Sequence, residues 1–405
     1  MKPIVRAGRM KPVHSDIRGP LFVEAMKRQK QGIDILKLNT GNPATFGFGL
    51  PDSIKNALME HMQDGVGYCD FKGMPQARQA ICDYETSKGI KGITPDDVFI
   101  GNGVSEVVSF ALTPLLNDGD EVLVPSPSYS LWGNSVYLED GKPVFYTCDE
   151  QANWYPDIQD IRSKITDKTK AIVIINPNNP TGVLYPKELL LEIIQIARES
   201  GLLIFADEIY DRLVMDGKQH ISLASLTEDV PVITLNGLSK SHCLCGYRCG
   251  WMVISGPREL TEDYRQGIIQ LTSLRLCANT LAQIVIPVAL DDMDTPASMV
   301  RPGGRIYEQR EATVRELEKI DGLSFVKNDA AFYVFPKLDV KKFNITNDKQ
   351  FAHDLLDVTN ILLVPGSGFD WKDPDHFRIV MLPQADILSD AIRRMGTFLD
   401  GYKQK

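Results

Sequence analysis

A lysine that directly follows an apolar strand is the first residue whose position suggests chemistry. Lys240 ends the segment 235–240 (Leu-Asn-Gly-Leu-Ser-Lys), and the β-branched run 232–235 before it is typical of a buried strand. Burial lowers the pKa of an ammonium group, because desolvation disfavours the charged form. An amine with a lowered pKa is the nucleophile that a Schiff base to an aldehyde cofactor requires. We therefore expect Lys240 to have a depressed pKa and to act as a Schiff-base lysine.

Groups suited to holding a phosphate lie near this lysine in the chain. Ser239 precedes it and Arg248 follows eight residues later. A glycine-rich turn at 101–105 (Gly-Asn-Gly-Val-Ser) runs into a predicted helix, whose first backbone N–H groups can bind an anion. The alternative for this turn is an ordinary helix start capped by Ser105. A nucleophilic lysine beside phosphate-binding groups points to pyridoxal 5′-phosphate (PLP).

A carboxylate and a phenol follow the next predicted strand upstream. Asp207 ends the apolar strand that begins at Leu202, and a buried carboxylate there requires a cationic partner. The protonated pyridine nitrogen of PLP is such a partner, and its charge makes the ring an electron sink. Tyr210 can bond the ring hydroxyl. The alternatives are a helix cap or a salt bridge for Asp207 and core packing for Tyr210.

Two other polar side chains suit a substrate carboxylate. Asn179 belongs to the turn 176–182 (Asn-Pro-Asn-Asn-Pro-Thr-Gly), where prolines fix the backbone and asparagines supply donors. Arg378 alternates with apolar neighbours on a predicted strand, so we expect it to point inward and bind a carboxylate through two hydrogen bonds. A plain turn is the alternative for 176–182, and an internal salt bridge is the alternative for Arg378.

An aromatic residue and a glycine complete the set. Tyr129 follows the short strand 121–124 and can stack on a planar ring, with core packing as the alternative. Gly41, in the segment 38–43, would let a substrate approach the backbone, with a plain turn as the alternative.

Alternating strands and helices are expected to position these residues. One helix contains Leu190, Ile193, Ile194 and Ala197 on one face and ends near Gly201. Continuous apolar strands separated by helices predict an α/β fold with a mainly parallel central sheet covered by helices on both faces. Ligands of such sheets bind outside the carboxyl ends of the strands, where the polar residues above follow. The expected strands are 98–100, 121–124, 170–175, 202–206 and 232–235, with a further helix at 105–116.

The chain changes character near residue 300. A Pro-Gly-Gly break at 302–304 is followed by a charged helix to about residue 320, three short strands and a final helix. This pattern predicts a smaller α+β domain, with strands around 331–335, 361–364 and 377–380. The expected domains are 1–47 (an arm with one helix at 19–32, and part of the small domain), 48–297 (the large domain that binds PLP) and 298–405 (the small domain).

Composition limits the classes of function. The 405 residues carry a net charge of −9, with no basic cluster that would indicate nucleic acid or an anionic membrane as partner. No apolar run approaches the roughly 20 residues of a membrane span, and the N-terminus lacks a signal-peptide core. Three of the seven cysteines crowd the lysine motif (Cys243, Cys245 and Cys249), but no spacing suits zinc or a disulfide framework. We expect free thiols, no metal and a cytoplasmic protein.

In this order, the motifs resemble the fold-type I PLP-dependent aminotransferases over essentially the whole chain. The resemblance implies that family's fold and cofactor, and a ping-pong transfer of an amino group between an amino acid and a 2-oxo acid. The motifs that carry it are Asn-Pro-x-Asn-Pro-Thr-Gly at 176–182, Asp-Glu-x-Tyr at 207–210, Ser-Lys at 239–240, Arg-x-Gly at 248–250 and Phe-Arg at 377–378.

The resemblance also implies roles for the residues around the cofactor. Lys240 would carry it as a Schiff base and later shuttle a proton, and Asp207 would pair with the pyridine nitrogen. Tyr210 and Asn179 would bond the ring oxygen, and Tyr129 would stack on the ring. The residues implied to hold the phosphate are Val104, Ser105, Ser239 and Arg248.

Two implications reach beyond the cofactor ring. Tyr68 matches a tyrosine that reaches the phosphate of the neighbouring subunit, so the resemblance implies a homodimer with shared active sites. Arg378 would hold the substrate α-carboxylate, with Gly41 and Asn179 beside it.

Within the family, the chain is most similar to the glutamate–pyruvate (alanine) transaminases. Many of these have tyrosine where this chain has Ser15, which puts substrate preference in question. Gly237 stands where aspartate transaminases usually carry a phosphate-binding hydroxyl. Arg18 is a candidate for the side-chain carboxylate of glutamate, whereas Arg275 suits a structural salt bridge better. The segments that carry this likeness are 16–20, 38–43, 67–70, 275–279 and 307–310.

Three alternatives stay open at this point. The enzyme could prefer another amino acid, or it could be a PLP carbon–sulfur lyase of the same fold. A PLP-binding transcription regulator fits less well, because it needs a DNA-binding domain before the fold and the chain is acidic.

Overall fold

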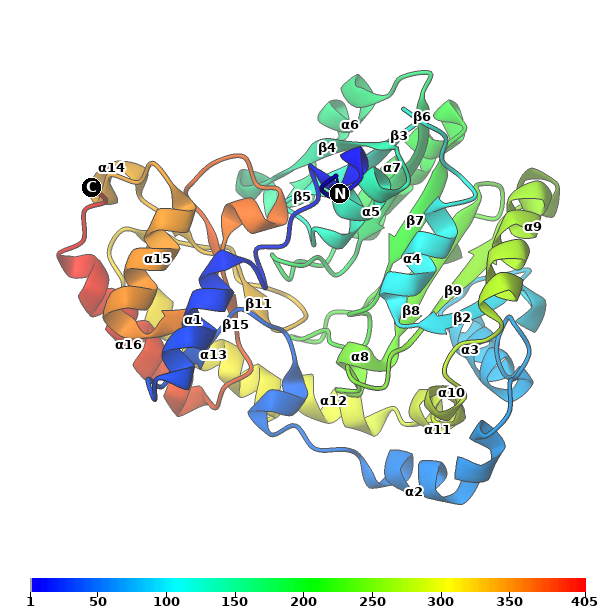
Figure 1. Cartoon of the computed structure of the whole chain (residues 1–405), viewed down its shortest axis with the longest axis horizontal. Helices are drawn as coiled ribbons and strands as arrows, with labels where there is room; N and C mark the ends of the chain where they lie inside the picture. The colour runs from blue at the N-terminus through cyan, green and yellow to red at the C-terminus, as the bar shows by residue number, and fades with distance from the viewer. Residues whose placement is uncertain (1) are drawn as a thin grey trace.

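An open sheet of eight strands forms the centre of the molecule within residues 2–405, which the computed structural model describes (Figure 1). The strand order is β2-β9-β8-β7-β6-β3-β4-β5. The five consecutive strands from β8 to β4 are parallel, whereas β9 runs antiparallel to both of its neighbours and β5 antiparallel to β4. The predicted mainly parallel sheet is confirmed. The strands are β2 (Val98–Asn102), β3 (Glu121–Ser126), β4 (Lys142–Asp149), β5 (Tyr155–Pro156), β6 (Thr169–Ile175), β7 (Leu203–Asp207), β8 (Val232–Gly237) and β9 (Cys249–Ser255).

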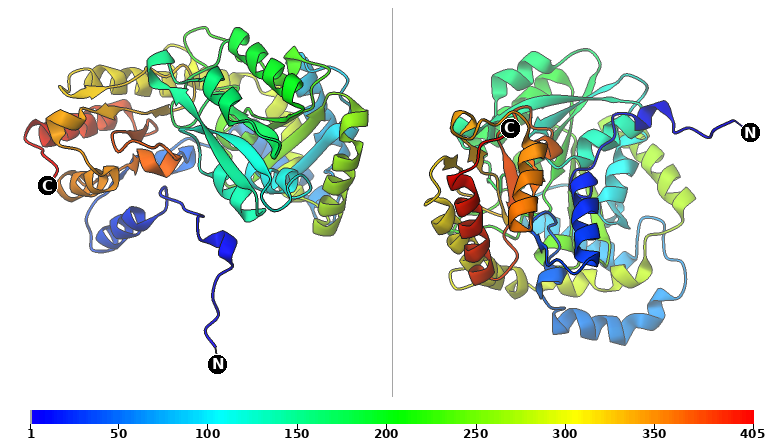
Figure 2. Two further views of the ribbon diagram at one scale, coloured as in Figure 1. Left: turned by 90° about the horizontal axis from the view of Figure 1, so that it is seen from above. Right: turned by 60° about the vertical axis from the view of Figure 1, so that its left-hand side comes forward.

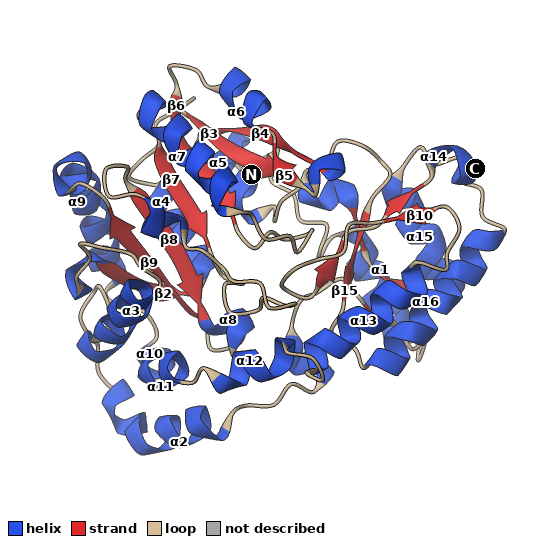
Figure 3. Ribbon diagram, turned by 180° about the vertical axis from the view of Figure 1, so that it is seen from behind, coloured by secondary structure: helices blue, strands red, loops and turns tan. Residues whose placement is uncertain are grey.

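Helices cover both faces of this sheet (Figure 3). The alternation of side chains along β6 agrees with this arrangement. Ile172 and Ile174 point into the apolar core that contains α7, whereas Ala171 and Val173 point into the core that contains α4 and α5. The helices up to residue 300 are α1 (Pro20–Lys30), α2 (Asp52–His61), α3 (Pro75–Ser87), α4 (Val104–Leu112), α5 (Leu131–Leu138), α6 (Ile158–Lys164), α7 (Lys187–Ser200), α8 (Leu238–Ser241), α9 (Arg258–Arg275), α10 (Thr280–Ile284), α11 (Ile286–Asp291) and α12 (Asp294–Val300).

The C-terminal part forms a smaller α+β unit with its own apolar core. Its three-stranded antiparallel sheet has the order β11-β15-β14, and two further strand pairs flank it. The strands are β1 (Leu36–Lys37), β10 (Leu323–Ser324), β11 (Tyr333–Val334), β12 (Lys337–Leu338), β13 (Ile361–Leu362), β14 (Val364–Pro365) and β15 (Phe377–Val380). The helices are α13 (Arg305–Leu317), α14 (Val340–Phe343), α15 (Asp348–Thr359) and α16 (Ala385–Asp400).

The N-terminal segment runs along both parts of the molecule. The short 3-10 helix Gly8–Met10 contacts α5 of the large sheet, and α1 contacts α15 and β13 of the smaller unit. Residues 2–7 extend away from the body (Figure 2). In the part of the chain that the structure describes, no helix is both long and apolar enough to cross a membrane. The predicted domain boundaries at 47 and 297 stay a prediction.

Several element boundaries differ from those that the sequence predicts. Strand β9 was not predicted, because its cysteine, glycine and tryptophan break the β-branched pattern. The segment expected as one strand at 361–364 forms two short strands instead. Strand β13 pairs with β1, whereas β14 pairs with β15. The strand expected at 331–335 shrinks to Tyr333–Val334, and Ala331 before it has a positive φ of 59°. Helices α4 and α13 end four and three residues earlier than expected.

Candidate active site

The predicted polar residues follow neighbouring strands and converge at one edge of the sheet. Asp207 pairs with Ile175 of β6 and with Leu235 of β8, so the ends of these three strands lie side by side. The turn that carries Asn179 follows β6, and Lys240 follows β8 on the short helix α8. The topology of a parallel sheet therefore brings the lysine, carboxylate and amide to one place.

Lys240 is inserted between the two parts of the molecule. Its Nζ donates a hydrogen bond to the Gly41 carbonyl oxygen at 2.9 Å, lies 3.9 Å from the Cys245 Sγ and faces the Phe332 ring at 6.0 Å. The expectation of a depressed pKa is wrong for the protein alone. Burial lowers the pKa of Lys240, but Tyr333, Cys245 and Tyr129 together raise it above its ordinary value. The sequence prediction counted only desolvation.

Asp207 is a buried carboxylate that no basic side chain neutralises. It is 5% exposed, and its Oδ2 accepts a hydrogen bond from the Trp132 Nε1 at 3.1 Å. Burial raises the pKa of Asp207 to about 6. Among residues 2–405, no Lys, Arg or His forms an ion pair with it, so the salt bridge offered as an alternative is not observed. The geometry thus suits a cationic ring nitrogen.

Arg378 presents a guanidinium group to the same region from β15. It is 1% exposed, and its Nη1 donates to the Asn179 Oδ1 at 2.9 Å, while its Nη2 donates to the Asn39 carbonyl oxygen. Its Nε has no acceptor, and within the described chain no carboxylate pairs with it. The internal salt bridge considered for Arg378 is therefore wrong. Burial lowers its pKa, which is the electrostatic cost that an added carboxylate would relieve.

Aromatic rings surround the guanidinium and the lysine. The Arg378 Cζ lies 4.5 Å from the centre of the Tyr333 ring and 4.6 Å from that of Phe369. The hydroxyl oxygens of Tyr210 and Tyr333 are 2.8 Å apart, and both side chains are buried. Burial raises the pKa of Tyr210 well above its usual value, so this phenol stays protonated. Tyr129 is 37% exposed at the same edge, so core packing does not account for it.

The start of α4 forms the turn predicted to hold a phosphate. Val104 is the first helical residue and Gly103 is the N-cap, with φ at +84°, so the cap by Ser105 offered as an alternative is not observed. A Cβ at Gly103 would lie 2.7 Å from the Arg248 Cζ, which places this guanidinium directly against the turn. Arg248 also donates to the carbonyl oxygens of Asn102 and Cys245.

Two glycines allow β9 to pack closely against this turn and against the end of β8. Gly237 and Gly250 pair across β8 and β9, and a Cβ on Gly250 would overlap the backbone nitrogen of Val104. A Cβ on Gly237 would lie 2.5 Å from the Cys249 carbonyl oxygen. Steric exclusion thus explains why glycine replaces a hydroxyl residue at 237. Ser239 follows two residues later and is half-buried.

The comparisons with known proteins agree with this arrangement. The family model for aminotransferase class I and II matches residues 33–392. The chain belongs to the class I and II aminotransferase family. The glutamate-pyruvate aminotransferase AlaA of Haemophilus influenzae is 50% identical, with both chains covered completely. The alanine aminotransferase of Mycobacterium tuberculosis is 45% identical over all of this chain and 94% of the relative.

Solved aminotransferase structures have the same fold. An aminotransferase from Escherichia coli superposes with a TM-score of 0.98 at 47% identity, with both chains fully covered. The alanine aminotransferase of Pyrococcus furiosus gives 0.93 at 41% identity, covering 98% of this chain and all of the other. Members of this aminotransferase family depend on PLP.

Four predicted residues lie outside the group around Lys240 or serve another role. Arg275 forms an ion pair with Glu106 at 2.5 Å, which confirms its structural salt bridge. Tyr68 is 83% exposed, and Arg18 and Ser15 are exposed on the N-terminal segment. The structure records no hydrogen bond or ion pair for the Arg18 side chain within residues 2–405.

Sequence reasoning missed two residues that contact the predicted site, Trp132 beside Asp207 and Tyr333 beside Tyr210. Trp132 lies three residues after Tyr129, and this proximity is the signal that could have pointed to it. The sequence contains no such signal for Tyr333, because its apolar segment is typical of a strand in the hydrophobic core.

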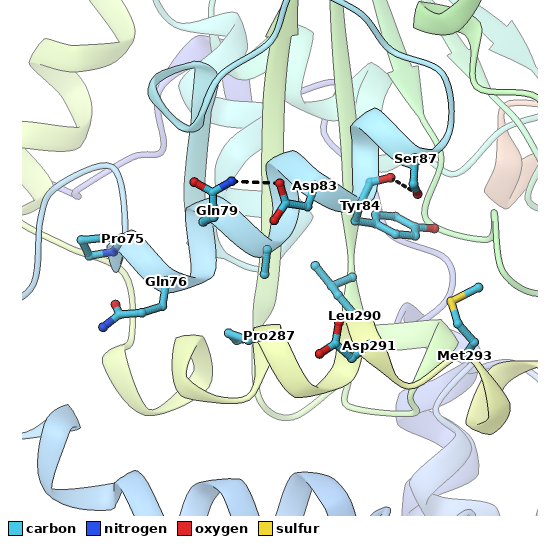
Figure 4. A pocket seen from close by; sticks show the side chains of 11 residues that line it. Pro75, Gln76, Gln79, Asp83, Tyr84, Ser87, Pro287, Leu290, Asp291 and Met293 are labelled. Carbon is cyan, nitrogen blue, oxygen red and sulfur yellow. Dashed lines mark hydrogen bonds between the residues drawn. The ribbon is translucent and has the colours of Figure 1, made fainter.

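A cavity elsewhere in the described chain is separate from this site. It has a volume of about 770 Å³ and lies between α3 and α11, where Gln76, Asp83 and Tyr84 face Leu290 and Met293 (Figure 4). None of the predicted cofactor or substrate residues lines it.

Proposed function

We propose that the protein is a PLP-dependent aminotransferase that moves an amino group between alanine and 2-oxoglutarate by a ping-pong mechanism. The observation that carries the proposal is Arg378, a fully buried guanidinium without a carboxylate partner, beside a lysine and an unneutralised aspartate. The printed names of the relatives, glutamate-pyruvate aminotransferase and alanine aminotransferase, support the choice of substrates.

The residues present fit PLP by their chemistry. Asp207 offers a buried carboxylate to the pyridine nitrogen, and Lys240 offers an amine to the aldehyde. Gly103, against Arg248, leaves the first N–H groups of α4 free of a side-chain cap. Asn179, Tyr210 and Tyr129 are the groups proposed to contact the ring, and the residues proposed to hold the phosphate are Val104, Ser105, Ser239 and Arg248.

The chain's own residues then divide the work of transamination. When bound, PLP supplies an aldehyde for the amino group and a ring that withdraws electrons. Arg378 and Asn179 hold the substrate α-carboxylate, which fixes the α-carbon near Lys240. Lys240 Nζ removes the α-proton and returns it at the other end of the transfer. Because its pKa is raised in the protein alone, Lys240 must lose a proton when it takes up the cofactor.

A second carboxylate must be accommodated when glutamate is the donor. We propose that Arg18 meets it, because its exposed side chain is on the segment that crosses between the two parts of the molecule. Asn39 ties this segment to the carboxylate site, since its Nδ2 donates to the Ile17 carbonyl oxygen at 2.8 Å and its own carbonyl oxygen accepts from Arg378. Ser15 stands on the same segment and leaves more room than a tyrosine would.

We also propose that two copies share their active sites. Tyr68 is exposed near Val66 (76% exposed), and a second copy would cover these side chains. A cavity of about 560 Å³ adjoins them, between residues 65–68 and 277–280. In this arrangement, Tyr68 reaches the phosphate of the partner subunit.

A panel of amino donors tests the substrates. The PLP-loaded enzyme should lose its pyridoxal absorbance and gain that of the pyridoxamine form with alanine and with glutamate, and pyruvate or 2-oxoglutarate should reverse the change. Poor reaction of both donors, with rapid reaction of another amino acid, would overturn the choice of substrates. Pyruvate and ammonia formed from cysteine without a 2-oxo acid would instead identify a carbon–sulfur lyase.

A further inference from the structure

Tyr333 is a buried phenol at the centre of the site, and the mechanism above gives it no role. It is 2% exposed and lies on β11, where it pairs with Val380 of β15, two residues beyond Arg378. Its Oη is 2.8 Å from the Tyr210 Oη, and its ring lies 4.5 Å below the Arg378 guanidinium. A single side chain thus contacts both the predicted ring-oxygen donor and the predicted carboxylate ligand.

We propose that Tyr333 is a positioning residue: it donates its hydrogen bond to Tyr210, which leaves the Tyr210 proton directed at the ring oxygen of the cofactor. The inference rests on the function proposed above. Each phenol has one proton, so only one of the two hydroxyls can donate across the 2.8 Å contact. If Tyr210 donated to Tyr333, it would have no proton left for the cofactor.

The surroundings of Tyr333 favour it as the donor. The positive charge of Arg378 on its ring face withdraws electron density and strengthens the O–H as a donor. No other hydrogen bond of the Tyr333 hydroxyl is recorded within residues 2–405, so nothing else takes its proton. The Tyr210 ring meets Tyr333 edge-on at 83°, and Phe332 packs against both rings, which holds the pair in place.

The same hydroxyl determines which residue can stand at position 41. A Cβ built on Gly41 would overlap the Tyr333 Oη, and it would lie 3.1 Å from the Tyr333 Cζ and 2.9 Å from the Phe332 Cε2. The Gly41 carbonyl oxygen accepts the hydrogen bond from Lys240. Tyr333 therefore also sets the distance between the backbone at Gly41 and the lysine, and it should couple energetically to Gly41.

The test compares Tyr333→Phe with a matched control, Tyr146→Phe. Tyr146 is equally buried and donates one hydrogen bond, to the Val173 carbonyl oxygen at 2.7 Å, within the large apolar core. The readout is the pH midpoint of the visible absorbance of the PLP-loaded enzyme. Without the donor from Tyr333, the Tyr210 hydroxyl is less polarised and less well oriented, so its hydrogen bond to the ring oxygen weakens. That bond favours the deprotonated form, so Tyr333→Phe should raise the midpoint by roughly half to one pH unit. Tyr146→Phe should leave it unchanged.

Kinetics of the same variant separate positioning from binding. Tyr333→Phe keeps the ring under Arg378, so KM for alanine should change less than about twofold while kcat falls about tenfold, the effect of one hydrogen bond. An unchanged absorbance midpoint in Tyr333→Phe would overturn the proposal. If the wild type shows neither PLP absorbance nor transamination, the proposed function itself has failed.

A second measurement needs no cofactor. Gly41→Ala should lower the Tm of the cofactor-free protein, and the loss should be clearly smaller in the Tyr333→Phe background, because the overlapping hydroxyl is gone. Equal losses of Tm in both backgrounds would show that Tyr333 does not constrain Gly41.

Discussion

At the residue scale, Arg378 is the side chain on which substrate recognition depends. Its planar fork can bind a carboxylate through two hydrogen bonds, which the ammonium of a lysine cannot reproduce. Arg378→Lys should raise KM for alanine about a hundredfold, equivalent to roughly 3 kcal/mol, with a smaller effect on kcat. Arg275→Lys is the matched control, because Arg275 forms an ion pair with Glu106. This variant should change KM for alanine by less than about twofold. Equal KM values for both variants would show that Arg378 does not bind the substrate.

The raised pKa of Asp207 predicts how the unfolding free energy of the cofactor-free protein depends on pH. Burial raises its pKa from 3.8 to about 6, so its favourable contribution is present below about pH 4 and is lost as pH rises through 6. Compared with Asp207→Asn, the wild type should therefore lose about 3 kcal/mol of unfolding free energy between pH 4 and pH 7. Urea denaturation of both proteins at several pH values measures this. Parallel curves of unfolding free energy against pH for the two proteins would contradict this prediction. Bound PLP should reverse the sign of the difference in unfolding free energy between the wild type and Asp207→Asn.

Local sequence patterns identify some residues of the site and miss others. Lys240, Asp207 and Asn179 each follow an apolar strand, so a local pattern is enough to single them out. Tyr333 and Trp132 could not be found in this way, because a buried aromatic residue in an apolar segment looks the same whether it packs or positions a neighbour. The direction of the Lys240 pKa also depends on residues distant in sequence, which no local pattern contains.

At the element scale, one buried ammonium holds α3 against the loop that carries Asp207 and Tyr210. The Lys88 Nζ lies 2.7 Å from the Glu85 Oε2, 2.8 Å from the Glu208 Oε2 and 3.1 Å from the Asp211 Oδ2. The same Asp211 oxygen accepts from the Asn236 Nδ2 at 2.7 Å, at the end of β8. This cluster therefore braces the strand end that leads to Lys240.

Removing this ammonium should be costly, because three carboxylates would be left together in the interior. Lys88→Met should lower the unfolding free energy by about 3–5 kcal/mol. Lys91→Met removes a lysine from an exposed ion pair with Glu228 and should cost less than about 1 kcal/mol. Urea denaturation of the two variants measures the difference, and similar losses would refute the bracing role of the cluster.

Element boundaries were predicted less well than element types, and the reasons are local. Gly201 ends α7 with φ at +65°, as a glycine beyond a periodic apolar face indicates. The apolar run at 361–364 gives no sign that it changes partner between Leu362 and Val364, because that change depends on β1 from the N-terminal segment. Long-range pairing decides such boundaries, and a single sequence does not contain it.

At the scale of the whole molecule, the proposed sharing of active sites predicts how mixed dimers behave. Lys240→Ala and Tyr68→Ala should each be strongly impaired as homodimers. A heterodimer of the two has one site with an intact Lys240 and the partner's intact Tyr68. Random reassembly of equal amounts should therefore restore about a quarter of wild-type activity, since half of the dimers carry one intact site out of two. Activity no higher than that of the unmixed variants would contradict the shared site.

In the whole molecule, the central sheet, the smaller unit and the aromatic residues between them converge on one lysine, Lys240. Borohydride reduction of the PLP-loaded enzyme, followed by peptide mass spectrometry, tests the role of this lysine most directly. We expect a single reduced cofactor adduct, on the peptide that contains Lys240, and its loss when alanine is added before reduction. An adduct on a different lysine, or cofactor absorbance that leaves no adduct on Lys240, would contradict this expectation.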